Sequence, residues 1–129
     1  MTKFNPQTRP RILLVDDETE LRMLTEMIFS DEGYEVSHAA DVKEAVRLHR
    51  ENPFDLIIAE LIMKDRNGFE TLAELRRQPV PARFIATAKS SWLPPELFRQ
   101  MARQLGAHSA LIKPFQHEEM IEAVQKALA

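Results

Sequence analysis

The sequence contains no cysteine, three glycines, one tryptophan and one tyrosine, and its net charge is −3. The lack of cysteine excludes disulfides, thiolate metal sites and cysteine nucleophiles. None of the glycines, Gly33, Gly68 and Gly106, directly follows the first apolar run, so a glycine-rich cradle for nucleotide phosphates is not indicated. A small flavin or nucleotide binder is therefore the function that the sequence supports least.

Long apolar runs are also absent, and none approaches the ~20 residues that a membrane-spanning helix needs. The first ten residues, MTKFNPQTRP, contain two prolines and lack the apolar stretch of a signal peptide. Lys and Arg are scattered, so neither a membrane nor a nucleic-acid surface is indicated. We expect a cytoplasmic protein in which residues 1–10 form a flexible N-terminal tail.

From residue 11 onward, short apolar runs alternate with segments of helical periodicity. The runs predicted as strands are RILLV (11–15), YEVSHA (34–39), LIIA (56–59), RFIA (83–86) and ALI (110–112). Strands that alternate with helices predict a single α/β domain over residues 11–129, with a parallel sheet covered on both faces. The more polar second run suits a strand at the edge of that sheet.

Local signals predict where the intervening helices begin and end. Asp41 and Glu44 have the spacing of a capping box at the start of the second helix. Two prolines at 94–95 are typical of the start of the fourth helix. Leu97, Met101 and Leu105 then recur at helical spacing, and Gly106 is typical of the end of that helix.

The working site of a parallel α/β sheet lies beyond the carboxyl ends of its strands. The polar residues that directly follow the apolar runs are Asp16, Asp17, Glu18, Glu60, Thr87 and Lys113. Taken singly, each has an ordinary explanation as a helix cap, a turn hydroxyl or a solvated charge. Together they predict an acidic site, and clustered carboxylates require a cation, either Lys113 or a bound Mg²⁺.

The segments ILLVDDE, DLIIAELIM, NG, ATA and LIKPF resemble the receiver domain of two-component response regulators, over residues 11–129. The resemblance implies a flavodoxin-like, doubly wound parallel sheet of five strands in the order 2-1-3-4-5, with five helices. It implies a signalling module rather than an enzyme. In this family, an aspartate that ends the third strand accepts a phosphoryl group from a histidine kinase.

The resemblance also assigns roles to individual residues. Asp16 and Asp17 would form the acidic pocket, and Thr87 and Lys113 would contact the phosphoryl oxygens. Pro114, after the lysine, stands where the family has a cis-proline. Whether Mg²⁺ binds stays open. The residues that would hold it are Asp17, Glu60 and, through its backbone carbonyl, Ile62.

The acceptor position holds Glu60 instead of aspartate. Glutamate reaches ~1.5 Å further, and a misplacement of ~1 Å can slow in-line attack on the order of 10²-fold. We therefore expect poor or absent phosphorylation at Glu60. Three consequences stay open: Glu60 imitates the phosphorylated state, the domain is a phosphate-independent binding surface, or Glu60 or Asp17 accepts phosphate slowly. The alternative function is a conventional Mg²⁺-dependent receiver in a phosphorelay.

Two further positions depart from the family pattern: Lys64 stands where proline is usual, and Ala110 where many receivers carry Tyr or Phe. Both favour a loss of ordinary switching. The expected partners are proteins, either a sensor histidine kinase or a downstream effector or output domain. Whether the chain also forms a homodimer stays open. Trp92, the single tryptophan, is a candidate partner surface or, equally, part of the core, folded over the rim of the site.

Overall fold

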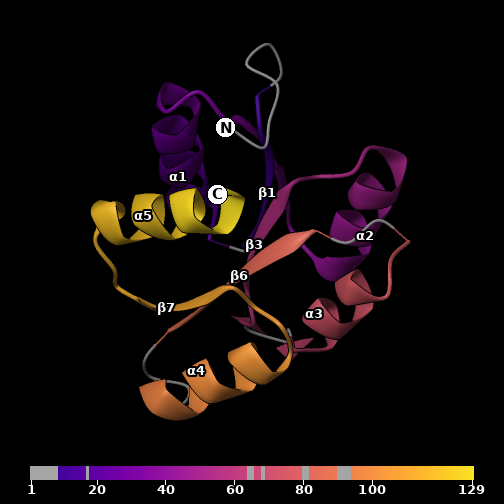
Figure 1. Ribbon diagram of the computed structural model, residues 1–129, viewed down its shortest axis with the longest axis vertical. Helices are drawn as coiled ribbons and strands as arrows, with labels where there is room; N and C mark the ends of the chain where they lie inside the picture. Colours follow the sequence, from indigo (N-terminus) through magenta and orange to yellow (C-terminus); the bar gives the residue numbers. More distant parts are fainter. Residues whose placement is uncertain (1–8, 17, 64–65, 68, 80–81, 90–93) are drawn as a thin grey trace.

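The structure is a computed structural model that describes residues 9–16, 18–63, 66–67, 69–79, 82–89 and 94–129 (Figure 1). Its main sheet is parallel and has the order β2-β1-β3-β6-β7. The five strands are β1 (Arg11–Val15), β2 (Glu35–Ala39), β3 (Leu56–Glu60), β6 (Arg83–Lys89) and β7 (Ser109–Lys113). The predicted order 2-1-3-4-5 is therefore confirmed, with the more polar second strand at one edge.

Helices cover both faces of the sheet. They are α1 (Thr19–Asp31), α2 (Val42–Glu51), α3 (Phe69–Arg76), α4 (Pro95–Gln104) and α5 (His117–Leu128). In Figure 1, α1 and α5 lie on one side of the strands and α2 and α3 on the other. The predicted flavodoxin-like α/β architecture with five helices is confirmed.

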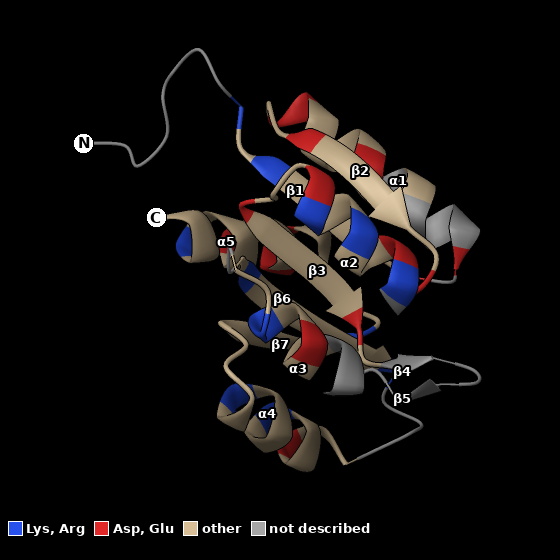
Figure 2. Ribbon diagram, turned by 90° about the vertical axis from the view of Figure 1, so that its right-hand side faces the viewer, with Lys and Arg blue, Asp and Glu red and all other residues tan. Residues whose placement is uncertain are grey.

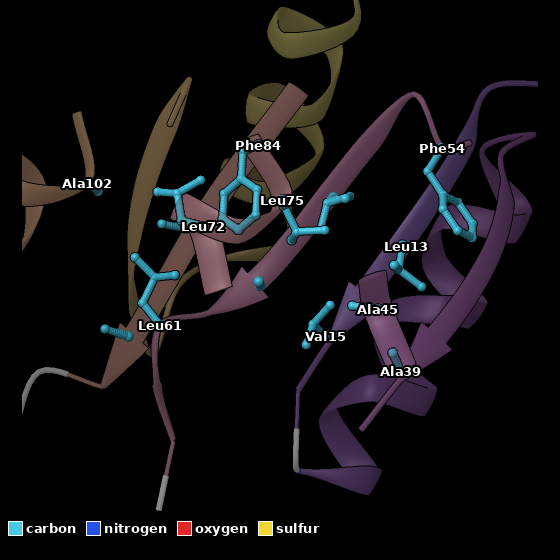
Figure 3. Packing of buried hydrophobic residues seen from close by; sticks show 14 of the residues in the cluster. Leu13, Val15, Ala39, Ala45, Phe54, Leu61, Leu72, Leu75, Phe84 and Ala102 are labelled. Carbon is cyan, nitrogen blue, oxygen red and sulfur yellow. The ribbon is translucent and has the colours of Figure 1, made fainter. Parts of the chain in front are cut away.

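Strand alternation divides the core into two buried clusters. Leu56 and Ile58 of β3 point into the cluster beneath α1 and α5, whereas Ile57 and Ala59 point into the cluster beneath α2, α3 and α4. Figure 3 shows the second cluster, in which Leu72 lies near Phe84. Because β3 is buried on both faces, its side chains are apolar along the whole strand until the final glutamate.

Helix caps follow the sequence signals in part. The Asp41 carboxylate accepts a hydrogen bond from the Glu44 N–H at 2.9 Å, as predicted. The buried side of α4 contains Phe98 and Ala102, which are fully buried, whereas Leu97 is 43% exposed. Apolar residues occupy two adjacent stripes of this helix, and the larger phenylalanine takes the central position against the sheet.

One short element was not predicted. Directly after β3, the strands β4 (Ile62–Met63) and β5 (Arg66–Asn67) pair in antiparallel fashion, outside the main sheet. Of the predicted tail, the structure describes only residues 9–10, and the Pro10 carbonyl accepts a hydrogen bond from the Glu35 N–H at 2.9 Å. No helix within the described residues has both the length and the apolar character to cross a membrane.

Candidate acidic site at the strand ends

Glu60 is the last residue of β3, and it is 2% exposed. The parallel register places it beside Thr87 of β6, which is also 2% exposed. The Leu61 N–H donates to the Thr87 carbonyl at 2.8 Å, which continues the pairing one residue beyond the strand. A buried carboxylate is costly without a charged or hydrogen-bonding partner, so its surroundings define the site.

Lys113, at the end of β7, supplies that partner. Its Nζ donates to Asp16 Oδ2 at 2.7 Å and to Glu60 Oε1 at 3.1 Å, and it lies 3.5 Å from Glu18 Oε1. The lysine side chain is 10% exposed. Burial by itself would lower the pKa of Lys113, but the hydrogen bonds and charges of Asp16 and Glu60 together raise it. One ammonium group therefore contacts three carboxylates at the ends of β1 and β3.

A second lysine extends this network toward solvent. Lys89 Nζ lies 2.9 Å from Glu18 Oε1, and the Glu18 N–H donates to Asp16 Oδ1 at 2.8 Å. The ion pair with Lys89 is the largest cause that lowers the pKa of Glu18, and the same contact raises the pKa of Lys89. Glu18 thus joins the ends of β1, β6 and β7 by contacting two ammonium groups.

The predicted site residues that the structure describes come together. Asp16, Thr87 and Lys113 line one small cavity, and Glu60 contacts the same lysine. The peptide bond between Lys113 and Pro114 is cis, as the resemblance implies. Next to this cavity, a pocket of about 320 Å³ is lined by Glu18, Lys89, Lys113, Pro114 and Phe115.

Some predicted residues cannot be placed in this way. Asp17, Lys64 and Trp92 lie outside the described residues, so their roles stay predictions. For Ile62 the structure gives the backbone, which enters β4. Ala110 is half-buried on β7 and pairs in register with Ala86, and its methyl group is the whole of its side chain.

The carboxylates also form a donor set for a metal ion. Asp16, Glu18 and Glu60 each offer an oxygen, and these oxygens lie within 4.8 Å of one another. Three carboxylate oxygens suit a hard cation such as Mg²⁺. The donor chemistry therefore fits, although the Lys113 ammonium already contacts all three groups and would compete with a second cation.

Sequence reasoning missed Lys89, and it placed Glu18 in the acidic site without assigning it a contact. The apolar run of the fourth strand was predicted to end at residue 86, but β6 continues to Lys89. Alternation along the strand was the available signal: Thr87 and Lys89 are two residues apart, so they lie on the same face. What the sequence could not show is that this face of β6 meets the loop after β1.

Comparison with known proteins identifies the family of the chain. The family model for the response regulator receiver domain matches residues 12–125. The chain belongs to this family. Receiver domains are signalling modules of two-component systems.

Among curated proteins, this receiver domain is 35% identical over 118 residues to the transcriptional regulatory protein CpxR of Klebsiella pneumoniae. It is 34% identical over 118 residues to CpxR of Escherichia coli strain K12. Each alignment covers 92% of the receiver domain and 49% of CpxR. The chain therefore spans about half the length of these relatives.

Solved structures agree with the fold. The chemotaxis response regulator CheY4 of Vibrio cholerae superposes with a TM-score of 0.81 at 30% identity, covering 94% of this chain and 100% of CheY4. The signal receiver domain of a LuxO repressor protein from Vibrio parahaemolyticus gives a TM-score of 0.83 at 27% identity, covering 94% of this chain and 91% of that chain.

Proposed function

We propose that this is an atypical receiver domain, in which Glu60 replaces the phospho-accepting aspartate and which signals through protein–protein contacts largely without phosphorylation. The observation that carries the proposal is the contact between Glu60 Oε1 and Lys113 Nζ at 3.1 Å, with the glutamate side chain 1% exposed. A carboxylate that must attack phosphorus has to be accessible and correctly placed. Here it is buried and already engaged.

The length of the glutamate explains what it does instead. By the family resemblance, Lys113 contacts phosphoryl oxygens, and the longer side chain brings a carboxylate oxygen to that same lysine. Glu60 therefore supplies part of the negative charge that phosphorylation would add. The imitation is incomplete, since a phosphoryl group carries close to two charges and a carboxylate one.

Mg²⁺ binding is a separate part of the proposal. Glu60, Asp17 and the backbone carbonyl of Ile62 would hold the ion, with Asp16 and Glu18 in the same acidic group. When bound, the ion would neutralise the acidic pocket. The protein's own contribution is to hold the carboxylates together through Lys113, so the pocket does not depend on the ion alone for a compensating charge.

The proposed partners are proteins, either a sensor kinase or an effector or output domain, in the cytoplasm. A conventional Mg²⁺-dependent phospho-accepting receiver is the second candidate. It is favoured by the three carboxylates within 4.8 Å of one another and by Thr87 in register beside Glu60. The two candidates differ in one measurable property, which is transfer of a phosphoryl group to residue 60.

The test is incubation with acetyl phosphate and Mg²⁺ followed by intact-mass spectrometry. We expect no added phosphoryl group on the wild type, and one on Glu60→Asp, with a rate at least ~10² times higher because the shorter carboxylate restores the attack geometry. Glu60→Gln is the matched control, since it keeps the length of the side chain and removes the nucleophile.

Two results would refute the proposal. One is rapid gain of a phosphoryl group by the wild type that is absent in Glu60→Gln. The other is a Glu60→Asp variant that is folded, by circular dichroism, and still gains nothing, because the added methylene would then not be what prevents the reaction.

A further inference from the structure

Glu18 is the most exposed of the three carboxylates that the structure describes at this edge of the sheet. Its side chain is 38% exposed, whereas those of Asp16 and Glu60 are largely buried. Glu18 occupies the N-cap position of α1, but its side chain makes no capping hydrogen bond. The carboxylate instead contacts the lysines at the edge that Figure 2 shows, where β3 ends in an acidic residue. Its contacts therefore belong to the site and not to the helix.

One oxygen of Glu18 lies between two ammonium groups. Glu18 Oε1 is 2.9 Å from Lys89 Nζ and 3.5 Å from Lys113 Nζ. This oxygen is shielded from solvent, yet no donor within the described part of the chain meets it with the geometry of a hydrogen bond. Attraction between charges, without a well-directed hydrogen bond, therefore holds it in place. A carboxylate oxygen held in this way remains available as a ligand for a hard divalent cation.

The same carboxylate is within reach of an ion that the other acids would hold. One oxygen each from Asp16, Glu18 and Glu60 can be chosen so that all three lie within 4.8 Å of one another. Asp16 and Glu60 each accept a hydrogen bond from Lys113, at 2.7 Å and 3.1 Å. Of the three, Glu18 is thus the carboxylate that can turn toward an ion at the least loss of directed hydrogen bonds.

Lys89 is free to release Glu18. Its side chain is 46% exposed at the end of β6, and it borders the pocket of about 320 Å³ that Glu18 and Lys113 also line. Open space beside the ion pair lets the ammonium group swing away without repacking the core. Lys113 has no such freedom, because it is 10% exposed and donates to both Asp16 and Glu60.

The balance of charge also makes Lys89 a competitor for a metal ion. Three carboxylates and two ammonium groups meet in this network, which leaves one negative charge uncompensated among the described groups. Without Lys89, two negative charges would be uncompensated. A unit positive charge within a Debye length of a divalent ion weakens binding of that ion roughly tenfold.

We propose that Glu18 is a ligand for a divalent cation at this site, and that Lys89 controls its availability, so that the ion binds by taking Glu18 from Lys89. This rests on the Mg²⁺ binding that forms part of the proposed function. Lys89 is then a positioning residue, which acts on the ion through Glu18. Its ammonium group is a tethered cation that keeps the affinity for free Mg²⁺ low.

The experiment is titration of the purified, metal-free chain with Mg²⁺ alone, up to ~50 mM, followed by amide chemical shifts in NMR spectra. Ionic strength is held at ~0.1 M or above with potassium chloride, so that screening is the same at every point. Four proteins form a cycle: the wild type, Lys89→Met, Glu18→Gln and the chain with both substitutions. Methionine and glutamine keep much of the side-chain length and remove the charge.

We expect Lys89→Met to bind Mg²⁺ roughly tenfold more tightly than the wild type, because the competing charge is gone. Glu18→Gln should bind roughly tenfold more weakly, because a charged ligand is lost. In the Glu18→Gln background, Lys89→Met should change the affinity by about threefold or less, since only screened repulsion between Lys89 and the ion is left to remove.

Two control variants separate this effect from net charge and from packing. Lys126→Met removes one positive charge from an exposed ion pair with Glu122 on α5, and it should leave the Mg²⁺ affinity unchanged. Lys89→Arg keeps the positive charge beside Glu18 and should stay within about threefold of the wild type. Circular dichroism and thermal unfolding in EDTA show whether each variant is folded before titration.

Three results overturn the proposal. The first is a folded Lys89→Met that binds Mg²⁺ no more tightly than the wild type, or not at all up to ~50 mM. The second is an equal gain from Lys89→Met with and without Glu18, because Lys89 would then act through its charge alone. The third is a Glu18→Gln variant with wild-type affinity. Each of these can occur whether or not residue 60 accepts a phosphoryl group, so intact-mass spectrometry tests the proposed function separately.

Discussion

Replacing Lys113 with methionine removes the ammonium group that lies 2.7 Å from Asp16, 3.1 Å from Glu60 and 3.5 Å from Glu18. Methionine keeps much of the length and apolar character of the lysine stem. The substitution therefore tests the charge of Lys113 more than its packing. What remains is a group of three carboxylates within 4.8 Å of one another, of which Glu60 is almost fully buried.

The size of the effect follows from these distances. At an effective dielectric constant of ~20, each contact near 3 Å has a gross attraction of ~5 kcal/mol. Burial of the lysine offsets much of this, so removing one partner of a buried ion pair typically lowers the free energy of unfolding by ~3–5 kcal/mol. Asp16 is 13% exposed and Glu18 is 38% exposed, which places the expectation at the lower end, ~3 kcal/mol.

Urea unfolding at about pH 7 measures this change. With an m-value of ~1.5 kcal/mol/M, a loss of ~3 kcal/mol lowers the midpoint by ~2 M urea. Glu60→Gln is the matched control: Lys113 keeps Asp16 and Glu18, so no buried charge is left without a partner, and the expected loss is smaller than that of Lys113→Met. In the variant that combines Lys113→Met with Glu60→Gln, the loss of the Glu60 charge relieves its repulsion with the other two carboxylates. Its stability should therefore exceed that of Lys113→Met alone by ~1–2 kcal/mol.

The pH dependence gives an independent check on the same reasoning. In Lys113→Met, protonating one of the crowded carboxylates relieves repulsion in the folded state but not in the unfolded chain. The folded variant therefore binds protons more readily, and its deficit relative to the wild type should shrink from about pH 7 to about pH 5.

Either of two results would contradict the account. One is a loss of less than ~1 kcal/mol for Lys113→Met at neutral pH, where the repulsion between the carboxylates that have lost Lys113 should be greatest. The other is a loss that stays constant with pH, because it would indicate a packing defect in place of a charge defect.

Two further predictions concern the network and the turns. Because Lys89 lowers the pKa of Glu18, their ion pair stabilises the fold above the ordinary glutamate pKa of 4.5 and loses that effect as the pH falls through the lowered pKa. The urea midpoints of the wild type and of Lys89→Ala should therefore differ near neutral pH and converge at acid pH. A difference that stays constant with pH would contradict this. Gly33→Ala and Gly106→Ala should each lower stability by ~1–2 kcal/mol in thermal unfolding, since both glycines have positive φ, 91° and 95°. A Cβ on Gly106 would lie 2.8 Å from the Arg76 guanidinium carbon, whereas a Cβ on Gly33 would lie in open space. The guanidinium, which donates to the Leu105 carbonyl, would have to move, so Gly106→Ala should lower stability by ~0.5–1.5 kcal/mol more than Gly33→Ala. In an Arg76→Ala background this extra loss should disappear.

Much of the site could be predicted from the sequence because of a simple property of parallel sheets. Every strand ends at the same edge, so polar residues that follow successive apolar runs must lie near one another. This property is sufficient to predict that Asp16, Glu60, Thr87 and Lys113 share one edge. The burial of Glu60 also followed, since its strand is apolar throughout and is covered on both faces.

Other features needed contacts between distant segments. The sequence did not indicate that Glu18 contacts both Lys89 and Lys113, because this depends on the loop after β1 meeting the last residue of β6. The sequence also did not indicate which of the two adjacent apolar stripes of α4 is buried, because only packing against the sheet selects Phe98.

The sequence by itself determined the order of strands and helices and the chemical types at the strand ends, because both follow from local patterns of apolar and polar residues. It also determined that the third apolar run ends in a glutamate, Glu60. The tertiary structure decided which oxygen of which carboxylate meets which ammonium group. It also decided that α1 and α2 cover opposite faces of the sheet. Both depend on how segments far apart in the chain pack across the sheet, which no local pattern specifies.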